Sequence, residues 1–186
     1  MDSKMTLKKT IGHFKTITYH KYLVMQGCFK IGLYKQGLLH DLSKYTWTEF
    51  KTGMKYYQGN KSPNGAEREL TGFSEAWLHH KGRNRHHYEY WMDVGPVREL
   101  GIVGVKMPAK YVAEMMMDRI AASKVYEGRA YRNDSPLAYY NLTKDYVIIH
   151  PETRKILEKL LKMLAAKGED YTYAYIRKVL LKNNDY

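Results

Sequence analysis

The sequence predicts an all-α protein, built as one helical bundle. Apolar residues recur at three- and four-residue steps through most of the chain, which is the period of amphipathic helices. No two alternating apolar runs are joined by a short turn of the kind that indicates a β-hairpin. With 186 residues, of which 44% are hydrophobic and 13% aromatic, the chain is long enough to bury a core as a single domain.

The N-terminal part is expected to contain two helices. Apolar side chains at mixed three- and four-residue steps predict a long helix over residues 6–35, in which Gly27 and Gly32 allow a break. Thr46–Glu49 match the capping box, a hydroxyl residue followed three positions later by Glu. They predict a short helix that ends near Tyr57.

The middle of the chain alternates loops with helical segments. Residues 59–65 have the composition of a loop, and a helix is expected over residues 66–81. Residues 82–84 interrupt it, and a second segment follows over residues 85–92. Residues 95–104 again have the composition of a loop.

The last third of the chain carries clear helix starts. Met107-Pro108 predicts a helix through Ser123, with Pro in its first turn. Ser135-Pro136 is typical of an N-cap followed by Pro and predicts a helix to about Asp145. His150-Pro151 starts another helix, which Gly168 ends, and a last helix follows over residues 169–181. The apolar stripe of the helix after His150 comprises Ile156, Leu157, Leu160, Leu161 and Leu164.

The whole chain, residues 1–186, is expected to form one domain. Its core would span residues 6–125, and the helices of residues 136–183 would either pack on this core or form the face of a homodimer. Periodicity does not distinguish these two arrangements.

Composition limits the compartment and the partners. The net charge of +12 favours an anionic partner, such as a phosphate ester, a nucleotide or nucleic acid. The same charge is explained equally well by a basic surface that is simply solvated. The single cysteine, Cys28, excludes an intramolecular disulfide and favours a reducing compartment. There is no signal-peptide pattern after Met1 and no apolar run of about 20 residues. These features predict a cytoplasmic protein that does not interact with membranes.

One short stretch, Leu38–Lys44, carries the strongest chemical signal. In it His40 and Asp41 are adjacent, so an imidazole nitrogen and a carboxylate oxygen can flank one metal ion if the end of a helix points at it. Four of the eight histidines lie within residues 79–87, a density that favours a site over a chance surface cluster. Further candidate ligands come from separate helices and are His20, His80, His87 and Asp118.

The individual assignments follow from position. His80 and His87 are seven residues apart, so they share a face if the helix between them is continuous. Asp118 lies on an otherwise apolar stripe, and since an unpaired buried carboxylate is costly, it needs a partner, which could be the neighbourhood of Arg119, a lysine or a metal ion. Glu114, one turn earlier, is either a supporting group or a base. We expect one or two divalent ions from the set Fe, Mn, Zn and Ni.

The order of these motifs resembles the HD superfamily of metal-dependent phosphohydrolases, whose pattern is H…HD…D with extra histidines in dinuclear members. Residues 38–44 look like its HDxxK core. More closely, the chain is similar to a small bacterial and phage family with HDLSK (40–44), HHxxRNxHHxxYW (79–91) and EMxxD (114–118). The resemblance spans residues 13–125. It implies an all-helical fold in which the histidine pairs complete a second metal site and the first site comprises His20, His40, Asp41 and Asp118.

The resemblance also implies an activity, hydrolysis of a nucleotide or another small phosphate ester. Lys44, Arg83, Asn84 and Arg85 would then hold the phosphate, since Arg offers a bidentate fork and Lys a point charge. His79 and His86 would act as an acid or as substrate contacts. Two alternatives stay open. One is a di-iron HD-like oxygenase, and the other is a non-enzymatic protein that binds nucleic acid or a partner protein.

Overall fold

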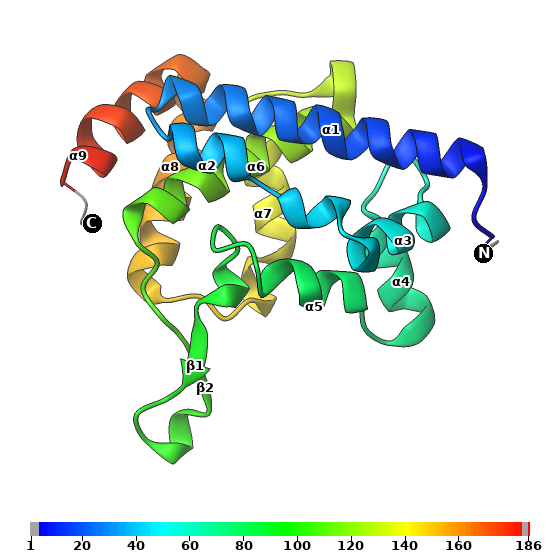
Figure 1. The fold of residues 1–186 in the computed structure, drawn as a ribbon. Coiled ribbons are helices and arrows are strands. Elements are labelled where there is room, and N and C mark those ends of the chain that lie inside the picture. Colours follow the sequence, from blue (N-terminus) through cyan, green and yellow to red (C-terminus); the bar gives the residue numbers. More distant parts are fainter. Residues whose placement is uncertain (1–3, 184–185) are drawn as a thin grey trace.

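The computed structural model describes residues 4–183 and 186, and it confirms the predicted all-α class (Figure 1). Short 3-10 turns join many of the helices, and a π-helical stretch, Ile176–Leu180, precedes the last one. In chain order the helices are α1 (Leu7–Lys30), α2 (Tyr34–Leu39), α3 (Trp47–Tyr56), α4 (Pro63–Thr71), α5 (Glu75–Lys81), α6 (Ala109–Glu127), α7 (Ser135–Thr143), α8 (Pro151–Tyr175) and α9 (Leu181–Asn183).

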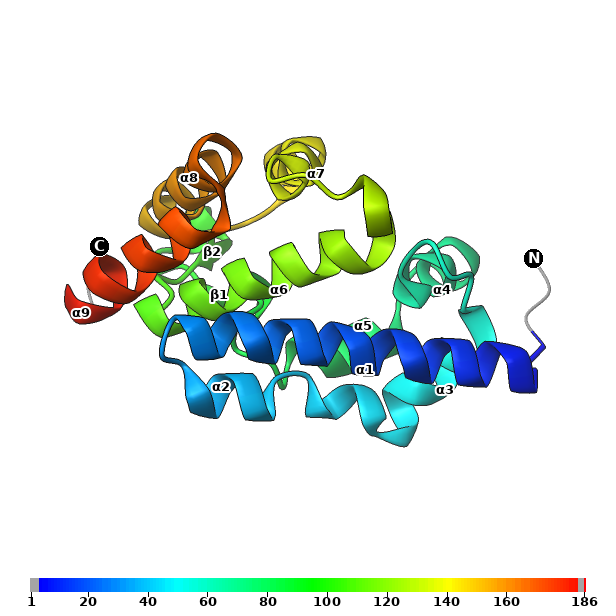
Figure 2. The ribbon, with the colours of Figure 1, turned by 90° about the horizontal axis from the view of Figure 1, so that it is seen from above.

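Helix α6 lies at the centre of the bundle. Viewed from above, α1 runs along one side of it and α7 and α8 cover the other side (Figure 2). Apolar residues surround nearly the whole circumference of α6, which is typical of a helix buried on all sides. Helices α2 and α3 pack on α1, so the segment that carries His40 and Asp41 lies next to both α1 and the centre of the fold.

The long N-terminal helix breaks where the sequence allowed it. Gly32 adopts the left-handed conformation with a φ of 86°, which glycine reaches without strain, and it separates α1 from α2. At its start, the side chain of Thr6 accepts a hydrogen bond from the backbone N–H of Lys9 and caps α1. Because α1 stays straight up to Lys30, His20 lies in its middle and on its buried side.

The single helix expected over residues 66–81 is two helices. Helix α4 already begins at Pro63 and ends at Gly72, which has a φ of 83°. Ser74 then caps α5 by accepting a hydrogen bond from the backbone N–H of Trp77. The apolar pattern continues across this break, so periodicity alone did not reveal it.

The expectation of no hairpin was wrong. Strands β1 (Met92–Val94) and β2 (Ile102–Gly104) pair antiparallel, with Met92 opposite Gly104. Residues 95–101 connect them, and this connection is too long to give the short-turn signal of a hairpin. The helix expected over residues 85–92 was also wrong, since the only helical turn described there is the 3-10 turn Tyr88–Tyr90, and Met92 already belongs to β1.

The C-terminal helices complete the core. Gly168, inside α8, has a φ of 77° and a ψ of −179°, so the helix breaks at the glycine where its end was predicted. Asp134, not Ser135, occupies the N-cap position of α7. The apolar stripe of α8 belongs to the same buried cluster as α6, which excludes that face as a dimer surface. Its members there are Ile156, Leu157, Leu160, Leu161 and Leu164.

Candidate metal centre

A strained turn brings His40 and Asp41 to the same interior point. Asp41 has a φ of 53° and a ψ of 26°, and it is the one described non-glycine residue with a positive φ. Asp tolerates this left-handed conformation better than most residues. Lys21 of α1 secures the turn by donating hydrogen bonds to the carbonyl oxygens of Leu38 (2.6 Å) and His40 (3.0 Å).

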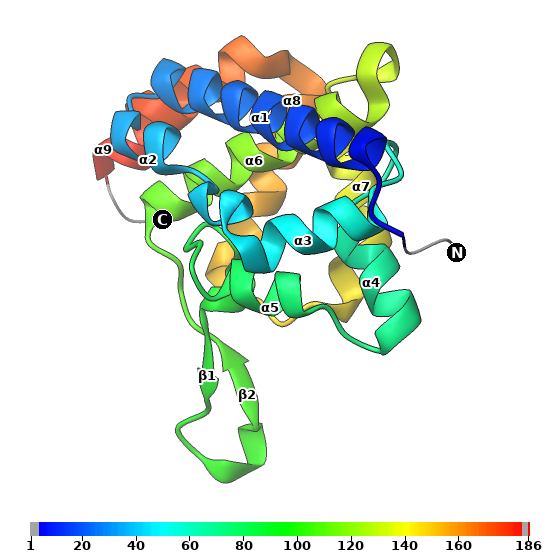
Figure 3. The same ribbon diagram turned by 45° about the vertical axis from the view of Figure 1, so that its right-hand side comes forward.

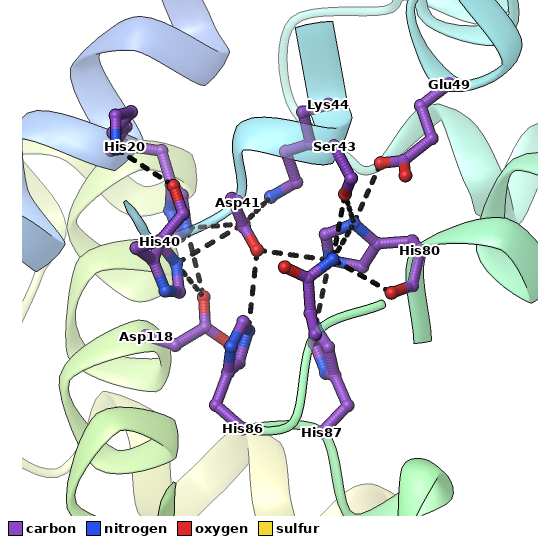
Figure 4. A network of polar contacts seen from close by, with 12 residues as sticks. His20, His40, Asp41, Ser43, Lys44, Glu49, His80, His86, His87 and Asp118 are labelled. Carbon is purple, nitrogen blue, oxygen red and sulfur yellow. Dashed lines mark hydrogen bonds and ion pairs between the residues drawn. The ribbon is translucent and has the colours of Figure 1, made fainter. Parts of the chain in front are cut away.

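A first group of donor atoms gathers between α1, this turn and α6 (Figure 4). The Nε2 atom of His20 lies 3.0 Å from Oδ1 of Asp118 and 3.6 Å from Oδ2 of Asp41. The Nε2 atom of His40 lies 3.3 Å from the same Asp41 oxygen and 3.6 Å from Oδ1 of Asp118. Two imidazoles and two carboxylates therefore converge on one point.

A second group shares Asp41 with the first. The other oxygen of Asp41, Oδ1, lies 3.4 Å from Nε2 of His80 and 3.5 Å from Nε2 of His86. His87 joins this group, because its Nε2 atom is 2.9 Å from Nε2 of His80. The Asp41 carboxylate thus lies between two clusters of imidazoles and faces each with one oxygen (Figure 4).

The donor atoms in these groups fit divalent cations. Five of them, Nε2 of His20, His40 and His86 and both carboxylate oxygens of Asp41, are buried without a hydrogen-bond partner among the described residues, although Oδ2 of Asp41 forms an ion pair with Lys44. Leaving such an atom unsatisfied costs about 1–3 kcal/mol, so a ligand is expected there. Ligand atoms about 2.0–2.2 Å from one metal ion lie roughly 3–3.5 Å apart, close to the spacing observed here. Imidazole and carboxylate together suit several first-row transition metals, so the donor set does not select among them.

Two further carboxylates orient the imidazoles from behind. Oε1 of Glu114 lies 3.0 Å from Nδ1 of His40 and 3.3 Å from Nδ1 of His86. Glu49 accepts from Nδ1 of His80 at 2.8 Å and from Nδ1 of His79 at 2.6 Å. When Nδ1–H donates to a carboxylate, the Nε2 lone pair is directed forward, as in carboxylate–histidine–metal arrangements. Glu114 is therefore placed to support His40 and His86.

The charged groups of the centre stabilise one another. Burial raises the pKa of Asp41, but His40 and Lys44 outweigh this effect and hold that pKa well below its usual value. Burial likewise opposes the charged form of Asp118, yet its contact with His20 keeps its pKa well below normal. Burial lowers the pKa of His40, whereas Asp41 and its other acidic neighbours raise it to well above normal overall. A metal ion would therefore compete with a proton for the Nε2 atom of His40.

The neighbouring histidine His87 behaves in the opposite way. Burial lowers its pKa well below the usual value, and His86 and His80 add to this effect. His87 is therefore neutral at physiological pH, as a metal ligand must be.

The centre reaches the surface at Lys44 and Asp118. Their side chains are 27% and 17% exposed, and Nζ of Lys44 lies 2.6 Å from Oδ2 of Asp41. Burial works against the charge of Lys44, but Asp41 and Asp118 raise its pKa above the ordinary value. A cationic group thus stands beside the shared carboxylate, at the edge of the centre.

The remaining residues with a predicted role lie around the centre. His86, expected to contact substrate, instead points its Nε2 atom at Asp41. Asn84 donates to Ser43 Oγ (2.8 Å) and to the backbone oxygen of His80 (2.8 Å), so it holds these residues in place. Arg83 contacts the backbone oxygen of His79 at 3.4 Å.

The guanidinium of Arg85 is directed elsewhere. It donates to the hydroxyl of Tyr111 at 3.4 Å and lies over the ring of Tyr90. The structure thus brings together the six predicted ligands, together with His86, and leaves Arg83 and Arg85 outside the two donor groups.

Sequence reasoning missed the role of Glu49. It was interpreted as part of a capping box with Thr46, but the Thr46 side chain donates to the carbonyl of Ser43 and does not cap α3. Glu49 shares a buried face of α3 with Gly53 and Tyr56, at spacings of four and seven residues. An acid on a buried helix face is the signal that would have identified it.

Replacing Glu49 with Gln is expected to weaken metal binding at the His80 group by about 10–100-fold, because His80 loses the carboxylate that orients it. Isothermal titration calorimetry with Zn²⁺ measures this change. Glu67→Gln is the matched control, since Glu67 is also buried but contacts Thr52 and Ser74 instead of a histidine. Equal affinities of Glu49→Gln and the wild type would show that Glu49 does not support a metal ligand.

Fold and site together define this chain as an all-α protein with a buried His/Asp cluster that is able to hold metal ions. The chain belongs to the family of unknown function DUF5662, whose model matches residues 9–163 and so includes every residue of the cluster. This match shows no HD-domain family, so the likeness to that superfamily rests on the order of the motifs. No curated protein and no solved structure matches the chain.

The membrane prediction was tested on the described part of the chain. None of the helices there combines the length and the apolar character that a membrane span requires.

Proposed function

We propose that this protein is a metal-dependent phosphohydrolase that acts on a nucleotide or another small phosphate ester. The observation that carries the proposal is the position of Asp41, whose two oxygens face two separate groups of imidazoles. Such an arrangement suits a pair of cations that share one carboxylate, and paired cations are a recurring solution for displacement at phosphorus. The net charge of +12 agrees with an anionic substrate.

Lys44 is the group best placed to bind the phosphate. Its ammonium lies beside the shared carboxylate, and the Lys44 side chain is 27% exposed, so Lys44 is placed to contact a substrate oxygen while it stays paired with Asp41. Cations bound in the two groups would supply Lewis-acid stabilisation and a water molecule of lowered pKa. Lys44 would add a positive charge on the same side, where charge develops on the phosphoryl oxygens.

His79 is the candidate proton donor. It lies next to His80 but does not belong to either donor group, and its side chain is 17% exposed. Glu49 accepts a hydrogen bond from its Nδ1 atom at 2.6 Å and so fixes the orientation of the ring. In hydrolysis, a water oxygen bonds to phosphorus while the P–O bond to the leaving group breaks. The leaving oxygen would take a proton from Nε2 of His79, and the proton given up by the water would restore it.

Replacing Lys44 with Met is expected to lower kcat by about 10²–10³-fold, because one electrostatic contact to the transition state is lost while the apolar stem stays. Phosphate release from nucleoside phosphates and from a generic phosphodiester, with Mn²⁺, measures the effect. Lys35→Met, on the exposed side of α2, is the control and should keep full activity. Unchanged hydrolysis by Lys44→Met at equal metal content would refute the phosphate-binding role.

The same assay tests the two alternatives from the sequence. Oxygen consumption with Fe²⁺, without phosphate release, would replace the hydrolase with an oxygenase. Salt-sensitive binding of nucleic acid without turnover of any substrate would show that the protein is a nucleic-acid binder and not an enzyme.

A further inference from the structure

The hairpin formed by β1 and β2 extends away from the bundle. Residues 92–104, here called the arm, project beyond the helices in both side views (Figures 1 and 3). The arm carries several aliphatic side chains that are 52–70% exposed. Such a group of exposed apolar side chains on one short segment is unusual for a surface that faces only water. These side chains are Val94, Val97, Leu100 and Ile102.

Backbone hydrogen bonds and close packing fix the conformation of the arm at both of its ends. At the tip end, the backbone N–H of Gly95 donates to the carbonyl of Gly101 at 2.7 Å. At the base, the N–H of Val105 donates to the carbonyl of Trp91, also at 2.7 Å. Gly104 packs against the backbone of Ile149 and His150, and a Cβ atom at this position would clash with the backbone nitrogen of His150. The fold therefore holds the arm out in one direction.

The edges of the arm add a second reason to expect a partner. Its sheet has only two strands in the described residues, so each strand leaves one edge unpaired. Proteins normally cover or blunt such edges, and charges at the strand edge or a covering helix are the usual means. Here the exposed side chains beside the edges are largely aliphatic.

The charge of the arm indicates which kind of partner it fits. The arm contains Asp93, Arg98 and Glu99, so its net charge is −1, and since the whole chain carries +12, the remainder carries +13. A slightly acidic arm is complementary to the basic body of the same protein and not to nucleic acid. Arg98 and Glu99 lie in the 3-10 turn at the tip, where insertion into a bilayer would bury charge at the greatest depth.

We propose that the arm docks on a second copy of this chain and forms a homodimer. A two-fold arrangement would bury both arms at once, each against the basic body of the other protomer. The proposal is independent of the proposed hydrolase activity, because the arm contains none of the residues of the metal centre.

Sedimentation velocity at micromolar concentration tests the proposal. The wild type should sediment with twice the mass of the chain, and Val97→Lys combined with Leu100→Lys should weaken the dimer by about 30-fold or more. Both positions are exposed, so these changes leave the core intact. The matched control places lysines at Leu70 and Leu142, which lie on helices and are 52% and 75% exposed, and should remain dimeric.

Three results would overturn the proposal. One is a monomeric wild type at these concentrations. Another is a dimer that persists unchanged in the double-lysine arm variant. The third is a monomer that binds anionic lipid vesicles through the arm, which would assign the same side chains to a membrane surface.

Discussion

Replacing Asp41 with Asn is expected to abolish metal binding in both donor groups at once. Asn keeps the size of the side chain and tolerates the left-handed backbone at this position, so the turn should persist. The change removes the charge that both groups share. We expect metal affinity to fall by more than the approximately 100-fold that loss of a mere supporting contact costs. Metal content after gel filtration, together with calorimetric titration, measures the loss.

A matched variant separates this effect from a general loss of charge. Asp134→Asn also replaces an acid with its amide, but Asp134 is exposed, and its one ion pair within the described residues is with Arg132. This control should bind metal like the wild type. If Asp41→Asn retained one full equivalent of tightly bound metal, Asp41 would not be the shared ligand.

Metal binding is also expected to stabilise the fold strongly. A cation that binds the folded state alone, at a free concentration 100 times its Kd, adds about 2.7 kcal/mol to the free energy of unfolding. For a chain of this size that corresponds to a rise in Tm of roughly 5–10 °C. The physical reason is that the cation satisfies the buried nitrogen and oxygen atoms that lack partners and draws the donor helices together. Differential scanning calorimetry of chelator-treated protein, before and after addition of Mn²⁺ or Zn²⁺, measures the shift.

The Asp41→Asn and Asp134→Asn variants serve again as the matched pair. The first should show almost no shift in Tm on addition of metal, and the second should show the full shift. An equal shift in both variants would locate the stabilising metal elsewhere on the protein.

The sequence predicted which residues form the centre better than it predicted how they are arranged. His20, His40, Asp41 and Asp118 were named from motif order and from the cost of an unpaired acid, and they meet in one group. The position of His86 was not predictable, because Gly82 ends α5 and the following loop, not a continuous helix, directs the second histidine pair. A loop conformation depends on tertiary contacts, which periodicity does not report.

Glu49 and the hairpin show two further limits of sequence reasoning. Glu49 satisfied a local capping pattern, and its long-range contact with His80 outweighs that local preference in the fold. The strands of the hairpin are short and are joined by a long connection, so their pairing leaves no clear signal in the sequence. The long helices were predictable because their apolar stripes extend over several turns.

Crystals grown with Mn²⁺, with diffraction data collected for anomalous scattering, test the central claim most directly. The account predicts anomalous density beside Asp41, within bonding distance of Nε2 of His20 and His40, and a further peak near Nε2 of His80 and His86. Crystals grown at saturating Mn²⁺ that show no anomalous density around Asp41 would contradict the assignment of this cluster as a metal centre.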